Sequence, residues 1–248
     1  MQLLKIQVMK TLIKLLAIAL LFGTTTSCFI DGIKGDRNVV TERRDISSEF
    51  MKIDANQGME VYLTMGDQVS LTIEADENLH DLIITEVKDG TLHIYTKKNI
   101  WSSKSRKVYV TALSINEIEV SSGAEVISEN TIKSEDLKIR ATSGSDVRLQ
   151  LNVDNLNCST TSGADARLKG KASTFTAKST SGSDINAQEL ETETCNVKVT
   201  SGADVYINVT QSLHANATSG GDIKYIGNPK KVQKDVSSSG SIRNKQNS

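Results

Sequence analysis

An acidic residue recurs through the second half of the chain, always two places after a glycine. The surrounding phrase is Ser-Gly, a small residue, the acid and then an aliphatic residue. A row of carboxylates could hold Ca²⁺, which prefers carboxylate and carbonyl oxygens, or could bond the amides of a turn, as Asp side chains commonly do. The acids are Glu125, Asp146, Asp165, Asp184, Asp204 and Asp222.

The cost of aligning these acids favours local bonding over metal binding. If equivalent residues stack about 4.8 Å apart, neighbouring carboxylates repel by roughly 0.9 kcal/mol in a water-like dielectric. We expect turn amides and the threonines two places before each glycine to offset this repulsion. Structural Ca²⁺ is the alternative, although the flanking glycines of calcium-binding nonapeptide repeats are missing. No other cofactor is expected.

A second group of candidate residues is a basic cluster that contains the only tryptophan of the chain. The cluster is typical of an exposed loop between strands, and the simplest interpretation is a solvated loop without a binding function. An aromatic ring among cations can both stack and pair, so the cluster is also a candidate contact for an acidic glycan, a lipid headgroup or a protein. The candidate binding residues are Lys97, Lys98, Trp101, Lys104, Arg106 and Lys107.

Other chemistry is poorly represented. The three histidines, His80, His93 and His214, lie far apart in sequence without ligand spacing, so we expect surface histidines and no metal site. No Gly-x-Ser-x-Gly elbow occurs, and the repeated serine before each glycine is expected to point inward as a packing residue. We therefore predict no catalytic residues. The net charge of −1 gives no indication of nucleic-acid binding.

The elements that position these residues follow from the period of the repeat. Apolar residues fall at odd offsets from each glycine and polar residues at even offsets, which predicts strands with one buried face. A period near 20 residues predicts a solenoid. The fold class is therefore all-β, a right-handed parallel β-helix with about 20 residues per coil. The repeat glycines, spaced by 21, 19, 19, 20, 18 and 20 residues, are Gly123, Gly144, Gly163, Gly182, Gly202, Gly220 and Gly240.

Three details of the coils can be predicted from this register. The glycine should allow a tight bend where a Cβ atom would clash. In the last copy Ile242 should take the place of the acid and help to cap the array. Cys158 and Cys195 should point inward from coils about 10 Å apart. Because a disulfide needs Cα atoms within about 7 Å, we predict two unpaired buried thiols.

The chain divides into five segments. Residues 1–28 have a basic start, a short apolar run and small residues before Cys28, which predicts a signal peptide with a lipobox-like cysteine that becomes acylated; a plain signal peptide is the alternative. Residues 29–37 form a tether. Residues 38–112 form an N-terminal β segment that either caps the solenoid or supplies its first irregular coils, with a hairpin at Asp89-Gly90. The repeat solenoid spans 113–242, and 243–248 is a polar tail.

Several stretches resemble a known family. They are Phe50-Met51-Lys52-Ile53, the segments 58–66, 75–79 and 89–94, and the Ser-Gly-Ala/Ser-Asp repeats that follow. Together, over residues 38–242, they are similar to the putative auto-transporter adhesin head, GIN domain family. The resemblance implies a β-helix similar to pectin-lyase-like folds, a secreted or lipid-anchored protein of a Gram-negative envelope, and a role in adhesion without assigned catalytic residues.

These observations favour a lipid-anchored protein of the outer membrane that displays a binding surface. It would face the periplasm or the cell exterior, with the membrane and an unknown glycan or protein as partners. A polysaccharide-active enzyme of the pectin-lyase type is one alternative, but aromatic residues make up only 4% of the chain and the acids lie in one regular row. A purely structural spacer is the other alternative.

Overall fold

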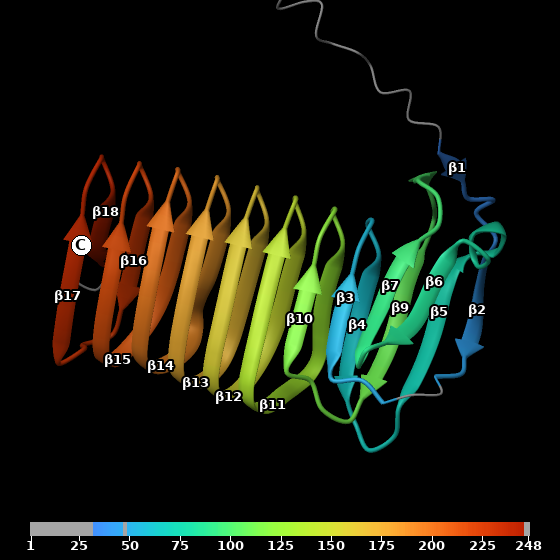
Figure 1. The fold of residues 1–248 in the computed structure, drawn as a ribbon, viewed down its shortest axis with the longest axis horizontal. Coiled ribbons are helices and arrows are strands. Elements are labelled where there is room, and N and C mark those ends of the chain that lie inside the picture. The colour runs from blue at the N-terminus through green and yellow to red at the C-terminus, as the bar shows by residue number, and fades with distance from the viewer. Residues whose placement is uncertain (1–31, 47–48, 246–248) are drawn as a thin grey trace, which may run out of the picture. The chain divides into compact units, whose positions relative to one another are not determined.

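One parallel ladder runs through most of the described chain, which covers residues 32–46 and 49–245 in the computed structural model. Long strands, each forming most of one coil, stack in chain order with parallel neighbours (Figure 1). The winding is right-handed, and the predicted β-solenoid is confirmed. These strands are β11 (Glu125–Thr142), β12 (Asp146–Thr161), β13 (Asp165–Thr180), β14 (Asp184–Thr200) and β15 (Asp204–Ala217).

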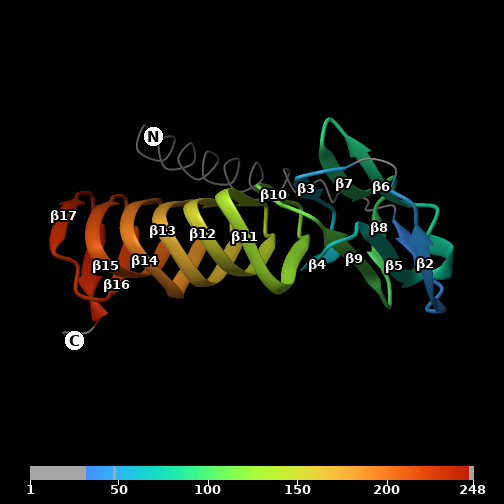
Figure 2. The same ribbon diagram turned by 90° about the horizontal axis from the view of Figure 1, so that it is seen from below.

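Each coil is a flattened loop with a tight corner at one end and a wide bend at the other (Figures 1 and 2). In β12 the side chains of Val147, Leu149 and Leu151 are buried, whereas Arg148 and Gln150 between them are exposed. This alternation is the period-two pattern of a strand with one face in a core. Because coils pair in register, apolar residues from successive coils fill one continuous interior.

The tight corner is a two-residue turn in which both residues have positive φ. Ser143 has φ 57° and Gly144 has φ 67°, as expected for a type I′ turn. The Gly144 amide donates to the Ser162 carbonyl of the next coil at 3.1 Å, and the same bond recurs from Gly123 through Gly220. The repeat phrases therefore occupy the same corner of successive coils.

Two expectations about this corner are wrong. The serine before the glycine is exposed rather than inward, because the two left-handed residues break the alternation; the small residue after the glycine, such as Ser145 or Ser183, is buried instead. A Cβ atom built on Gly144 would meet nothing within 4 Å. The glycine is favoured by its positive φ, which costs other L-residues about 1–2 kcal/mol, and not by a clash.

Both cysteines in the described residues are free, as predicted. Cys158 lies in β12 and Cys195 in β14, with β13 between them. Burial raises the pKa of each thiol to about 12, so both remain protonated and unreactive at neutral pH. The Thr192 hydroxyl lies 2.9 Å from the Cys195 sulfur.

The N-terminal segment supplies two further coils. In one of them, Gln57 and Gly58 form a tight corner with positive φ, and Glu60 pairs in register with Glu125. In the other, a loop of residues 97–105 replaces the tight corner. The strands are β3 (Lys52–Ala55), β4 (Glu60–Met65), β7 (Thr91–Thr96), β9 (Arg106–Ala112) and β10 (Glu117–Val120), which leads into β11.

The order of these coils in the stack differs from their order in the chain. The β3–β4 coil lies between the β7–β9 coil and the β10–β11 coil. Antiparallel strands then close this end of the ladder: β2 (Val39–Arg44) pairs with β5 (Ser70–Asp76), which pairs with β9, and β6 (Ile83–Lys88) pairs with β7. Asp89 and Gly90 form the predicted hairpin turn between β6 and β7.

Short elements complete the N-terminal end. A 3₁₀ helix, η1 (Glu77–Leu79), follows β5, and β1 (Ile33–Lys34) pairs with β8 (Ile100–Ser102) in the loop that replaces the corner. No helix in the described residues is long and apolar enough to cross a membrane.

The C-terminal end is formed by β16 (Asp222–Ile226), β17 (Lys231–Val236) and β18 (Ser241–Asn244). The last corner is shifted by one residue, so that Ser238 and Ser239 have the positive φ values. Ser241 pairs with Asp222, and Ile242 pairs with Ile223. The expectation that Ile242 takes the place of the acid is therefore wrong; Ser241 does, and Ile242 continues the interior column.

An inward lysine protects the end of the ladder. Lys234 on β17 is in register with buried Ala215, so it occupies an interior column, and its amine lies 4.9 Å from the centre of the Tyr225 ring. Val232 and Val236, on either side, are 44% and 52% exposed. An inward charge on an edge strand opposes pairing with another chain, because pairing would bury the charge.

We expect Lys234→Val to promote self-association through this end. The substitution would leave three valines in a row on an unpaired strand edge, and the mean mass in analytical ultracentrifugation should rise above that of the wild type at equal concentration. Lys231→Val, at an outward position of the same strand, is the matched control. Equal masses for all three proteins, or the same rise for the control, would contradict this role.

Candidate functional site

The acidic residues of the repeats form one column along the solenoid. Asp146 pairs in register with Glu125 on one side and Asp165 on the other, and the pairing continues to Asp222. The column also includes Glu60, which the sequence analysis missed; the Gly-x-Glu-Val pattern at residues 58–61 was the available signal. It ends beside Lys107 and, at the other end, Ser241.

Arginines two residues further along the strands offset part of the repulsion. Arg148 pairs with Glu125 of the preceding coil. Arg167 bridges two coils, with guanidinium nitrogens 3.5 Å from Asp146 and 3.7 Å from Asp165. The next residue in this basic column is Asn186, and there the compensation stops.

Asp184 lies next to that interruption. Burial raises the pKa of this carboxyl, and the neighbouring charges of Asp165 and Asp204 raise it further. We expected the threonine column to offset the repulsion between the carboxylates, and this expectation is wrong. The threonine hydroxyls face the adjacent corner serines instead, as in the 3.4 Å contact of Thr180 with Ser181. Among the described residues there is no group of three or more His, Cys, Asp or Glu arranged to hold a metal.

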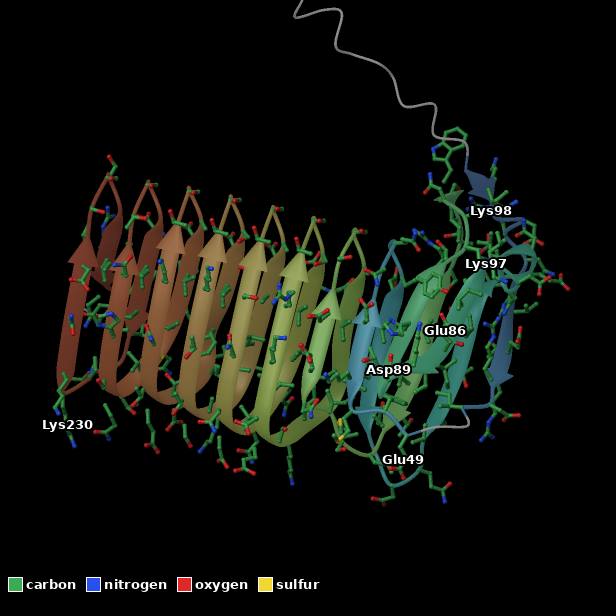
Figure 3. The ribbon with its side chains drawn as sticks, viewed as in Figure 1. Glu49, Glu86, Asp89, Lys97, Lys98 and Lys230 are labelled. Atoms are coloured by element: carbon green, nitrogen blue, oxygen red, sulfur yellow. The ribbon has the colours of Figure 1, made fainter. Side chains whose placement is uncertain are left out.

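The basic cluster is divided between two places. Lys97, Lys98 and Lys104 are exposed on the loop between β7 and β9, where Figure 3 labels the first two. Trp101 on the same loop is 74% exposed, the largest exposure of any bulky apolar side chain in the described residues. We call residues 97–105 the Trp101 loop.

A buried carboxylate fixes the base of the Trp101 loop. Asp76, at the end of β5, is fully buried and accepts backbone hydrogen bonds from Lys104 at 2.9 Å, Ser105 at 3.0 Å and Arg37 at 3.0 Å. A Cβ atom on Gly35 would lie 2.0 Å from this carboxylate, so the tether approaches it closely only because residue 35 is glycine. Asp76 thus joins three segments that are distant in sequence.

The charge of Asp76 is favoured by its donors. Burial opposes ionisation, but the amides of Ser105, Arg37 and Lys104 together outweigh it and lower the pKa of the carboxyl. The loop is further held by β1, whose Ile33 amide donates to Asn99 at 2.8 Å. The Trp101 side chain is therefore presented from a fixed base.

Arg106 and Lys107 lie away from the tip of this loop. Arg106 packs its guanidinium against the Gln57 corner, 3.5 Å from that carbonyl oxygen. Lys107 is on the wall formed by β4, β5 and β9, 3.8 Å from Glu74 and 5.8 Å from the Tyr62 ring centre. Tyr62 stacks on Tyr109 with ring centres 5.1 Å apart, a pair that sequence reasoning missed because it joins β4 to β9.

The histidines form no common site. His93 and Asp54 make a 3.0 Å contact across β7 and β3, and His214 is exposed on β15. His80 is buried rather than on the surface as expected, with its Nδ1 3.0 Å from Glu42. Cys28, the predicted acylation site, lies outside the described residues.

We expect Asp76→Asn to destabilise the protein by about 2 kcal/mol at pH 7, because an amide matches the three backbone donors poorly. The folded-state pKa of Asp76 is lowered, so its contribution is present above the unfolded value of about 3.9 and is lost as the pH falls through the folded-state value. Denaturation at pH 7 and at pH 2 should therefore show a smaller difference from the wild type at pH 2. Asp154→Asn, an exposed carboxylate, is the control; a constant difference at both pH values would contradict the assignment.

Solved structures with the same architecture cover most of the chain. An adhesin, described as putative, from Bacteroides fragilis is 27% identical with a TM-score of 0.81, and the match covers 86% of this chain and 100% of that one. A protein from Parabacteroides distasonis described as a putative lipid binding protein is 22% identical with a TM-score of 0.71, covering 86% and 98%. This second likeness shows the fold alone.

Another similar structure is an adhesin, also described as putative, from Parabacteroides merdae, 23% identical with a TM-score of 0.69, covering 86% of this chain and 99% of that one. No curated protein matches the sequence. Residues 49–229 match the family described as "Putative auto-transporter adhesin, head GIN domain", which confirms the resemblance seen in the sequence. The chain therefore belongs to the auto-transporter adhesin head, GIN domain family.

Proposed function

We propose that the protein is a lipid-anchored binding protein of the outer membrane of a Gram-negative cell, and that it contacts its ligand through the Trp101 loop. Membership of the adhesin head family, and the likeness to structures described as adhesins, support a function of the adhesion type. The observation that carries the proposal is the exposed tryptophan on a loop whose base is fixed by buried Asp76.

Physical chemistry supports a contact role for this loop. A loop that carries an exposed tryptophan and exposed lysines can bury a large apolar area and pair with negative charge at the same time. The fixed base limits the conformational entropy that is lost when a ligand binds. Aromatic residues of this kind are enriched among the side chains that dominate interface energies.

The position of the proposed anchor is consistent with this arrangement. Cys28 precedes β1 by a few residues, and β1 pairs with β8 in the Trp101 loop.

The long wall of the solenoid carries ordered columns of polar side chains, which suit a surface for binding better than an active site with convergent groups.

We expect Trp101→Ala to reduce adherence of cells that carry the protein by at least about tenfold, as for loss of a central aromatic contact. Adherence would be measured on immobilised host-cell and envelope glycans with equal amounts of protein in the envelope. Leu113→Ala, another exposed bulky apolar residue, should behave as the wild type. Unchanged adherence of the Trp101 variant would remove the loop from the proposal.

We expect Cys28→Ser to abolish acylation, because the thiol is the group that would carry the lipid. Cells fed radiolabelled palmitate should label the wild-type protein and not the variant, and the variant should move from the membrane fraction to the soluble envelope fraction. Cys158→Ser, at a buried thiol, is the control. A wild-type protein without label would show that the segment is a plain signal peptide.

A further inference from the structure

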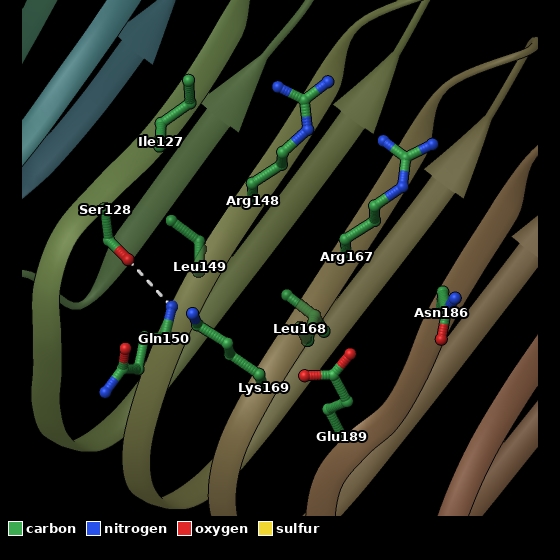
Figure 4. A pocket seen from close by; sticks show the side chains of 10 residues that line it. All are labelled: Ile127, Ser128, Arg148, Leu149, Gln150, Arg167, Leu168, Lys169, Asn186 and Glu189. Atoms are coloured by element: carbon green, nitrogen blue, oxygen red, sulfur yellow. Dashed lines mark hydrogen bonds between the residues drawn. The ribbon is translucent and has the colours of Figure 1, made fainter.

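A groove on the wall that carries the acid column is separate from the Trp101 loop. It has a volume of about 390 Å³, within the usual range for small-ligand sites. Its floor is formed by β12 and β13, the two neighbouring coils of 19 residues. Figure 4 shows Arg148 and Arg167 side by side on these strands, and Lys169 further along β13, next to Gln150.

Bulges in the flanking coils form the sides of the groove. On β11, residues 128–130 face the single residue Leu149 of β12. On β14, residues 187–188 face the single residue Leu168 of β13. Extra residues in a paired strand must leave the regular wall, so the two short coils lie between two longer ones. The strand spacing makes this depression about 14 Å wide between the flanking coils.

The side of the groove on β11 is held in place by hydrogen bonds. The Asn130 side chain accepts from the Met65 amide and donates to the Met65 carbonyl, both at 2.8 Å. The Ser128 hydroxyl accepts from the Gln150 amide at 2.8 Å. A groove with a fixed side requires little rearrangement when a ligand binds.

Three cationic side chains line the groove and have donors that an anion could use. Each guanidinium has five donors, and the contacts of Arg148 with Glu125 and of Arg167 with Asp146 and Asp165 all lie on the side of the tight corner. Among the described residues Lys169 forms no ion pair, although it pairs in register with Glu189 of β14. Glu189 is the one acidic residue among those that line the groove.

The neutral groups favour a sugar rather than a bare ion. Ser128, Gln150 and Asn186 supply hydroxyl and amide groups beside the cations, and these can bond sugar hydroxyls. The residues that line the groove include no aromatic ring, so it lacks the stacking surface on which recognition of a neutral sugar often depends. A guanidinium pair matches planar carboxylates and sulfate esters, which accept two parallel hydrogen bonds.

We propose that this groove binds an acidic sugar residue of a glycan, with Arg148, Arg167 and Lys169 holding its carboxylate or sulfate group. The proposal builds on the proposed binding function, but it concerns a different site and can be tested on the purified protein without cells. Loss of adherence in the Trp101 variant would not affect it.

The test is isothermal titration of the purified protein with three probes: a galacturonic acid trimer, a sulfated heparin disaccharide and the neutral sugar maltotriose. We expect binding of at least one acidic probe that weakens as salt is added, and no binding of maltotriose. Arg167→Gln and Lys169→Gln should each weaken it about tenfold, as for loss of one charge-assisted contact. Arg140→Gln, which removes an exposed arginine paired with Glu119, should leave the affinity within about twofold.

The outcomes separate the two sources of negative charge and can overturn the proposal. Binding of the galacturonate alone assigns the groove to uronic acids, and binding of the disaccharide alone assigns it to sulfated sugars. Binding unaffected by Arg167→Gln and Lys169→Gln, equal binding of maltotriose, or no heat with any probe would refute it. Because both substitutions are at exposed side chains, thermal unfolding should confirm that the variants fold as the wild type does.

Discussion

The tight corner, with its bond from each glycine amide to the serine carbonyl of the next coil, is the contact on which the rest of the structure depends. Two consecutive residues with positive φ reverse the chain, and the bond keeps successive corners level. Because the corners are level, the side chains on either side of them align in columns. The apolar columns form the core, and the polar columns form the walls. A change in one coil length therefore appears as a local bulge and not as a loss of register at the corner.

Alignment of the acids in a column also makes their carboxylates repel one another, and the basic residues that offset this repulsion are unevenly distributed along the column. Arg148 and Arg167 offset Glu125 and Asp146 of the preceding coils, and Arg167 also offsets Asp165 of its own coil. From Asp184 onward the basic column contains Asn186 and Tyr206 before Lys224, and the carboxyl of Asp184 is harder to ionise. The same arginines lie at the edge of the groove between the two longer coils. Compensation of the acid column and the proposed binding role of the arginines thus come from one arrangement of coil lengths and charges.

The two ends of the ladder are closed by different means. At the N-terminal end the chain reverses direction, and antiparallel strands cover the parallel coils. At the C-terminal end an inward lysine lies over the ring of Tyr225. Both devices oppose pairing of another chain with the ends of a stack of parallel coils. The Trp101 loop belongs to the N-terminal closure, where Asp76 joins the tether, β5 and the loop in one buried cluster.

The sequence by itself determined the coil, its period, the inward columns and the separation of Cys158 from Cys195. Those features follow from an alternation of two and a repeat near 20, both of which are local properties of the chain. It also indicated the basic cluster and its exposed tryptophan. It did not indicate that Arg106 and Lys107 face elsewhere, that serine at the corner points outward, or that Glu60 extends the acid column.

Only the tertiary structure decided these points, because they depend on which segments become lateral neighbours. The β3–β4 coil lies between coils that follow it in the chain, and Asp76 gathers donors 28 to 39 residues away. The groove likewise requires the relative lengths of four stacked coils and the position of each bulge. Such contacts are set by packing between coils, whereas the pattern along one strand specifies only which of its own side chains face the core.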